Sequence, residues 1–308
     1  MRPGLQLPRF EAMSGRTRTN RLGYVFLAPG VTLVLALSIF PLLMSLSLTF
    51  VYWDMANPIS GIRWAGLDQW GRLFGDEHFF IVLRNTILYV VIGIPVQYGL
   101  GLMLARALDR QIRARNTLRV FFLVPMMLSP VVVAFVVGRV MFNEAVGPIN
   151  AALKAMGAAP VPWLSDSFAS FITVLLVDTW QWTPFFMLVM LAGLSALPQE
   201  VEEAARLDTT SDTQAFWRVI FPMLAPWTIT AVLIRSVEML KIVDVIVVLT
   251  NGGPGIATES LTLYAYRTGV VNFDLGYAAA LSFTLLILAI VSAMGLLFAT
   301  RRFIARAT

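Results

Sequence analysis

The sequence contains no cysteine and a single histidine among its 308 residues. The lack of cysteine excludes disulfides, thiol nucleophiles and cysteine-ligated metals, and it leaves the redox compartment unmarked. The one histidine, His78, lies in a polar stretch and is flanked by acidic residues, so we expect a solvated loop residue rather than a ligand.

Charge is also scarce. Charged residues make up 13% of the chain and hydrophobic residues 58%, with a mean hydropathy of +0.76. A soluble domain of this length could not cover so much apolar surface, so the composition predicts an all-α polytopic membrane protein.

Several motifs are absent as well. The chain has no G-x-x-x-x-G-K-[ST] nucleotide loop, no nucleophile–base constellation, no metal cluster and no nucleic-acid-binding signature. No cleavable signal is expected, because the apolar run after Arg16, Arg18 and Arg21 is too long for one. We therefore expect no catalytic residue, no metal and no cofactor in this chain, and no nucleic-acid partner.

Apolar runs predict six transmembrane helices within one domain over 23–300, between an N-terminal tail (1–22) and a C-terminal tail (301–308). A short helix is expected over 149–156, between the third and fourth spans. The six spans are predicted at about 23–50, 85–108, 120–142, 168–197, 223–250 and 276–300.

Basic residues orient these spans. Arginines concentrate in the N-terminal tail, in the connection between the second and third spans, and in the C-terminal tail, whereas the connections at 51–83, 143–167 and 251–275 hold few. The positive-inside rule then predicts a multi-pass membrane protein with both termini and the 198–222 loop in the cytoplasm.

Charges inside the spans are costly, about 2.5–3.5 kcal/mol each on insertion scales, if they face lipid. The fifth span is expected to carry Arg235, Glu238, Lys241 and Asp244 on one slowly drifting helix face, at intervals of three residues. Two interpretations stay open: a salt-bridge network that locks the bundle, or the lining of a water-filled path. The other charges within spans are Arg139 and Asp178.

Aromatic residues give a second indication of a path. Trp180, Gln181 and Trp182 combine rings with an amide, which suits a sugar site but also suits helix packing near a membrane interface. The predicted substrate path consists of Asp178, Trp180, Gln181, Trp182, Glu238, Lys241 and Asp244.

The 198–222 loop is long, acidic and regular for a connection between two spans. A helix is expected after Pro198, with Val201, Ala204, Ala205 and Leu207 on one side, and a second short helix is expected to end at Pro222. A turn at 209–212 would separate them. This shape indicates a docking element for a protein in the water phase.

The sequence Glu203-Ala204-Ala205-x-x-Asp208, followed by Phe216, Ile220 and Pro222, resembles the EAA loop of binding-protein-dependent ABC importer permeases. Three further stretches are similar to the carbohydrate branch, with its maltose and glycerol-3-phosphate permeases: WQWTPFFMLVMLAGLSALP, VDVIVVLTNGGP and ATESLTLYAYRTGVVNFDLGYAAA. The GYVFLAPG region also looks like that branch's first span.

The resemblance implies a permease that moves an oligosaccharide, polyol, glycerol-phosphate or sulfonated sugar derivative by alternating access. The implied partners are a second related permease in a heterodimer, a cytoplasmic ABC ATPase dimer that binds ATP and Mg, and an extracytoplasmic solute-binding protein, all within membrane lipid. The implied ATPase-coupling residues are Glu203, Ala204, Ala205, Asp208, Thr209, Phe216 and Pro222.

Thr209 departs from the family pattern, which has glycine at this position. A β-branched residue at positive φ is costly, so either the turn has another geometry or Ser211 or Asp212 takes the glycine's role.

Two other functions remain as alternatives. An ion-coupled secondary transporter could use the charged face of the fifth span as a relay. An intramembrane enzyme would need a catalytic pair, for which Asp178 and Asp244 are the weak candidates.

Overall fold

The computed structural model describes residues 26–57, 59, 61–109 and 115–307. The predicted tail over 1–22, the first residues of the first span, and Arg110 and Arg113 of the connection between the second and third spans lie outside the described residues. The side chains of the predicted 301–308 tail also lie outside them.

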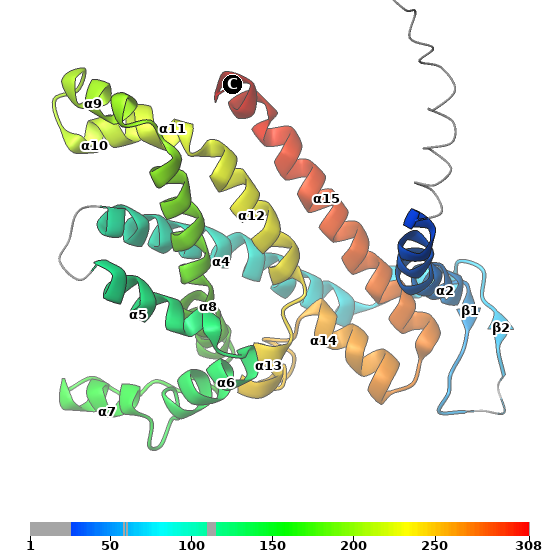
Figure 1. Cartoon of the computed structure of the whole chain (residues 1–308). Coiled ribbons are helices and arrows are strands. Elements are labelled where there is room, and N and C mark those ends of the chain that lie inside the picture. The colour runs from blue at the N-terminus through cyan, green and yellow to red at the C-terminus, as the bar shows by residue number, and fades with distance from the viewer. Residues whose placement is uncertain (1–25, 58, 60, 110–114, 308) are drawn as a thin grey trace, which may run out of the picture.

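The described chain is helical apart from one small hairpin (Figure 1). The helix over Phe26–Leu48 includes a π-helical turn, η1 (Leu35–Ile39), and α2 (Phe40–Leu48). The later elements are β1 (Val51–Tyr52), β2 (Arg63–Trp64), α3 (Asp68–Gly75), α4 (Glu77–Asp109), α5 (Arg115–Met127), α6 (Pro130–Val133), η3 (Ala134–Val140), α7 (Pro148–Ala155), α8 (Ser167–Ala196), α9 (Gln199–Leu207), α10 (Asp212–Ala215), η4 (Phe216–Ile220), α11 (Phe221–Met223), α12 (Ala225–Leu240), α13 (Asp244–Leu249), α14 (Leu261–Tyr266), η5 (Arg267–Val271) and α15 (Leu275–Ala307).

The hairpin of β1 and β2 lies in the stretch predicted as a polar interfacial connection. Its strands pair antiparallel, with Val51 opposite Trp64 and Tyr52 opposite Arg63. This stretch also contains α3, and the following helix begins at Glu77, eight residues before the predicted start of the second span.

Four helices are long and apolar enough to cross a membrane: Phe26–Leu48, α4, α8 and α15. Two bent helix pairs raise this number to six if each counts as one span. They are α5 with the helix over Pro130–Val140, bent by 97°, and Asp212–Met223 with α12, bent by 65°.

The third and fifth spans are therefore not the continuous helices that the apolar runs predicted. The helix α5 ends at Met127, and α6 begins at Pro130 after the extended residue Ser129. Proline disfavours a helical conformation in the residue before it, which explains the break. The fifth span is divided between α12 and α13.

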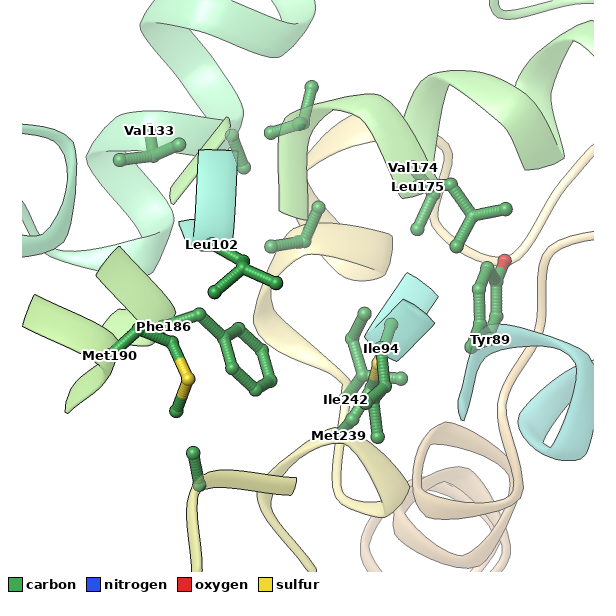
Figure 2. Packing of buried hydrophobic residues seen from close by; sticks show 14 of the residues in the cluster. Tyr89, Ile94, Leu102, Val133, Val174, Leu175, Phe186, Met190, Met239 and Ile242 are labelled. Carbon is green, nitrogen blue, oxygen red and sulfur yellow. The ribbon is translucent and has the colours of Figure 1, made fainter. Parts of the chain in front are cut away.

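The core forms where α4 packs along α8 and both meet α12. Figure 2 shows Leu102 and Ile94 from α4, Phe186 and Met190 from α8, and Met239 from α12 in this core. Asp166 begins α8 by accepting hydrogen bonds from the Phe168 and Ala169 N–H groups, and the helix ends before Pro198.

Gly101 allows the close approach of α4 and α8. A Cβ atom at this position would lie 2.5 Å from Phe186 Cβ and 2.8 Å from the Met187 backbone nitrogen. Gly101→Ala is expected to destabilise the chain by about 1–3 kcal/mol, because the helix backbones would have to separate. Thermal unfolding in detergent measures the effect.

Gly99→Ala is the matched control, since a Cβ at Gly99 meets nothing within 4 Å. Alanine has the higher helix propensity, so this variant should unfold at the same temperature or a higher one. Equal losses in the two variants would show that the crossing does not depend on Gly101.

Candidate substrate path and docking loop

Six of the seven predicted path residues line one polar cavity of about 250 Å³. Helix α8 contributes Asp178, Gln181 and Trp182, α12 contributes Glu238, the segment after α12 contributes Lys241, and α13 contributes Asp244. The other lining residues are Pro130, Arg235, Ile242, Val243 and Val245.

Trp180 is the exception. Its side chain is 41% exposed and lines a separate apolar cavity of about 480 Å³ with residues of α4 and α5, among them Met103 and Phe122. Helix positions two residues apart lie about 200° apart, so Trp180 points away from Asp178 and Trp182. Trp180, predicted on the path, therefore lies outside the polar cavity.

A buried ion pair forms one wall of the polar cavity. Arg235 Nη2 lies 2.5 Å from Asp178 Oδ2, and both side chains are 3% exposed. Gln97 of α4 bridges the pair: it accepts from Arg235 Nε at 2.9 Å and donates to Asp178 Oδ2 at 2.7 Å. The guanidinium lies 4.4 Å from the centre of the Trp182 ring, so the network joins α4, α8 and α12.

This network differs from the predicted seam along the fifth span. Arg235 pairs with another helix rather than with Glu238. Gln97 was missed by the sequence reasoning, although an amide in the middle of an apolar run was a usable signal.

A helix break at 241–243 also interrupts the predicted continuous row of charges along the fifth span. Helix α12 ends at Leu240, and the carbonyl groups freed there accept hydrogen bonds from side chains near α14. Ser260 Oγ donates to Ile242 O at 2.6 Å, and Thr262 Oγ1 donates to Leu240 O at 3.2 Å. Hydroxyl groups often satisfy such carbonyls within a membrane, so the break is stable.

The break leaves Lys241 beside Glu238 and separates Asp244 from both. Lys241 Nζ lies 2.8 Å from Glu238 Oε1, and both side chains are about half exposed, at 57% and 46%. Asp244 is exposed at the start of α13 and has no hydrogen-bond or ion-pair partner among the described residues. The predicted single drifting face of four charges is wrong.

The 198–222 loop has the predicted shape of two short helical segments. Helix α9 is followed by a turn over 208–211 and then by α10, η4 and α11. In Figure 1 these helices lie at one end of the molecule, and α7, α13 and α14 lie at the other. Arg106 of α4 lies 3.7 Å from the centre of the Phe216 ring and joins the loop to the bundle.

The predicted coupling residues divide into two groups. Glu203, Ala204, Asp208 and Pro222 are exposed. Ala205 is 3% exposed and Phe216 4%, so these two pack beneath the surface of the loop. Leu207, predicted on the same side of the helix as Ala205, is 87% exposed.

Thr209 is half-buried in a turn that does not need positive φ. Its Oγ1 donates to Ala205 O at 2.6 Å, and Ser211 Oγ accepts from the Gln214 N–H at 3.3 Å. Among the described residues, the non-glycine positions with positive φ are Asn251 and Phe273. The turn therefore has another geometry, the first of the two outcomes expected for Thr209.

His78 is not a solvated loop residue, which corrects the prediction. It lies in the first turn of α4, where its ring stacks on Tyr264 with 4.1 Å between centroids. Its Nε2 lies 2.7 Å from Glu259 Oε2, and Arg267 Nη1 lies 2.8 Å from Glu259 Oε1. Glu259 is fully buried, so these contacts fasten the segment before α14 to α4.

Asp76 makes a second link at this end. Burial alone would raise the pKa of its carboxyl group, but hydrogen bonds from Tyr264, Tyr277 and the N–H groups of Phe79 and His78 hold that pKa below its usual value. The link therefore stabilises the fold above pH about 4 and is lost as the pH falls through the lowered pKa.

We expect Asp76→Asn to lower the unfolding temperature at pH 7. Below pH about 4 the unfolding temperature of the variant should decrease less with falling pH than that of the parent, because asparagine cannot ionise. Glu77→Gln removes an exposed neighbouring carboxylate and should keep the acid dependence of the parent. If the unfolding temperature of Asp76→Asn depends on acid pH as that of the parent does, the pH effect belongs to other groups. Thermal unfolding in detergent at several pH values is the measurement.

Among the described residues, no three His, Cys, Asp or Glu side chains lie together as a metal site. Asp178, one of the two candidates for an intramembrane catalytic pair, is instead bound to Arg235.

Comparison with known proteins identifies the architecture. Residues 97–304 match the family model of the binding-protein-dependent transport system inner membrane component. A trehalose/maltose transport system permease protein of Thermococcus litoralis is 31% identical, over 86% of this chain and 88% of its own. An sn-glycerol-3-phosphate transport system permease protein of Agrobacterium fabrum is 30% identical, over 87% and 91%.

Solved structures show the same fold. A chain of a bacterial ABC transporter involved in the import of the acidic polysaccharide alginate matches with a TM-score of 0.79 and 22% identity, over 95% of this chain and 99% of its own. A bacterial alginate ABC transporter in complex with an alginate pentasaccharide-bound periplasmic protein matches with a TM-score of 0.78 and 21% identity, over 95% and 98%.

Proposed function

Because the chain belongs to the family of binding-protein-dependent transport system inner membrane components, we propose that it carries a sugar or sugar-like solute across a bacterial inner membrane, with both termini in the cytoplasm. The chain is an ABC importer permease and not itself an enzyme. An extracytoplasmic binding protein delivers the solute, and a second related permease completes the pathway.

The geometry of the 198–222 loop is the main support for this proposal. It presents Glu203, Ala204 and Asp208 on an exposed short helix, fastened to the bundle through Phe216. Small residues permit close approach to a partner cleft, and carboxylates can pair with basic groups there. A cytoplasmic ATPase dimer, which binds ATP and Mg, docks on this loop and drives the spans between inward-facing and outward-facing states.

The ion-coupled alternative needs a row of charges that could relay an ion. Arg235 and Asp178 are fixed to each other and to Gln97, while Lys241 lies in the helix break and Asp244 beyond it. The described geometry therefore supports a polar site better than a relay.

The test is the ATPase activity of the chain purified in lipid with co-expressed neighbouring gene products. We expect an ATPase subunit to co-purify, and its activity to rise when one loaded binding protein is added from a panel of sugars. If no ATPase co-purifies and a proton or sodium gradient drives uptake, the proposal is wrong.

A further inference from the structure

Gln181 leaves an unsatisfied acceptor in the wall of the polar cavity. Its side chain is 2% exposed, its Nε2 donates to the Leu128 carbonyl at 3.2 Å, and its Oε1 is buried with no hydrogen-bond partner. The amide cannot be flipped, because the Leu128 carbonyl can only accept. A buried acceptor without a donor is costly, so it indicates a ligand that supplies an N–H or O–H group.

The charges around the cavity also favour an uncharged ligand. Three carboxylates line it, Asp178, Glu238 and Asp244, against the two cations Arg235 and Lys241. Each cation is already paired with a carboxylate, Arg235 with Asp178 and Lys241 with Glu238. Asp244 alone is unpaired among the described residues, so the lining has one net negative charge.

An anionic group fits this lining poorly. Ionised phosphate, sulfonate and carboxylate oxygens are acceptors, so a hydroxyl group of the solute, and not its anionic group, must supply the donor that Gln181 Oε1 lacks. They would also be repelled by Asp244, and both cations are already neutralised. A hydroxyl group both donates and accepts, and it has no charge to be repelled.

The remaining features suit one sugar ring. A volume of about 250 Å³ corresponds to roughly eight water molecules at about 30 Å³ each. Trp182 is partly exposed and adds an aromatic side chain to the polar lining, as is common in small-molecule sites.

We infer that this cavity binds an uncharged polyhydroxylated solute, a neutral sugar or polyol, and rejects phosphorylated, sulfonated and carboxylated sugars. Asp244 sets the preference for an uncharged solute, and Gln181 selects a solute with a hydroxyl group. The inference rests on the proposed function, and it narrows the cargo to a class different from the glycerol 3-phosphate and acidic alginate in the names of two similar transporters.

The test measures binding to the purified importer complex without its binding protein, so that the signal comes from the permease site and not from the binding protein. Matched pairs of radiolabelled probes with one sugar ring differ only in one phosphate: glucose and glucose 6-phosphate, mannose and mannose 6-phosphate. We expect the neutral member of a pair to bind at least tenfold more tightly.

Two variants assign the preference to residues. Asp244→Asn should strengthen binding of the phosphorylated probe about tenfold and leave the neutral probe within about threefold. Gln181→Leu should weaken the neutral probe about tenfold, because a hydrogen bond to a buried acceptor is lost. Glu77→Gln, which removes an exposed charge outside the cavity, should change neither probe.

The inference is overturned if the phosphorylated probes bind as well as the neutral ones, if Asp244→Asn leaves the ratio unchanged, or if no probe binds. These outcomes differ from failure of the proposed function. An importer whose ATPase responds to a loaded binding protein but whose site prefers anions would keep the function and refute the substrate class.

Discussion

Asp178→Ala is expected to destabilise the chain by about 3–5 kcal/mol, the usual cost of leaving a buried charge without its partner. Arg235 is 2% exposed, and Asp178 is its carboxylate partner. The loss should appear as a lower yield in the membrane and a lower unfolding temperature in detergent. By contrast, Glu238→Ala breaks a pair that is about half exposed and should cost about 1 kcal/mol or less.

The double replacement Asp178→Leu with Arg235→Met separates the two roles that the sequence left open for these charges. Well-packed apolar residues often replace a buried ion pair without loss of stability, so the double variant should recover most of the stability that Asp178→Ala loses. If it also transports normally, the pair only locks the bundle. If it is stable but inactive, the pair forms part of the solute path.

Much of the architecture could be predicted from hydropathy. Helices α8 and α15 each begin one residue before the predicted start of their span. The polar interruption after Pro198 also gave the two-helix loop. These features depend on local periodicity and on proline, both of which can be read along the chain.

The breaks in the third and fifth spans could not be predicted with the same ease. Pro130 marked the first, but apolar residues continue on both sides and mask it. The second has no proline or glycine between Leu240 and Asp244. It is stabilised by Ser260 and Thr262, about 20 residues later, so the deciding hydrogen bonds are tertiary.

Side-chain directions within the candidate sites were also beyond the sequence. Trp180 and Trp182 are nearly adjacent, yet only Trp182 reaches the polar cavity, because the rotation of α8 is set by its packing on α4 and α12. Likewise, Ala204 is exposed and Ala205 buried on the same short helix. His78 was misjudged because its partner, Glu259, is 181 residues away.

Glu203→Lys combined with Leu207→Glu is expected to abolish the coupling of this chain to its ATPase. Both side chains are exposed, Leu207 at 87%, so the isolated chain should fold as before. Burying a reversed charge and a new carboxylate at a partner surface typically costs several kcal/mol, which corresponds to at least a hundredfold weaker association. The measurements are co-purification of the ATPase and stimulation of its activity by the loaded binding protein.

Two further variants make the result specific to the docking surface. Glu77→Lys reverses an exposed charge next to His78, which stacks on Tyr264 of α14, at the end of the molecule away from the 198–222 loop. This variant should leave ATPase co-purification unchanged. Phe216→Ala removes a buried ring beneath Arg106 and should lower the thermal stability of the chain as well as coupling, because the loop loses its anchor. Full coupling in the Glu203→Lys, Leu207→Glu chain would show that the ATPase binds elsewhere, since two charge changes within an interface would weaken it strongly.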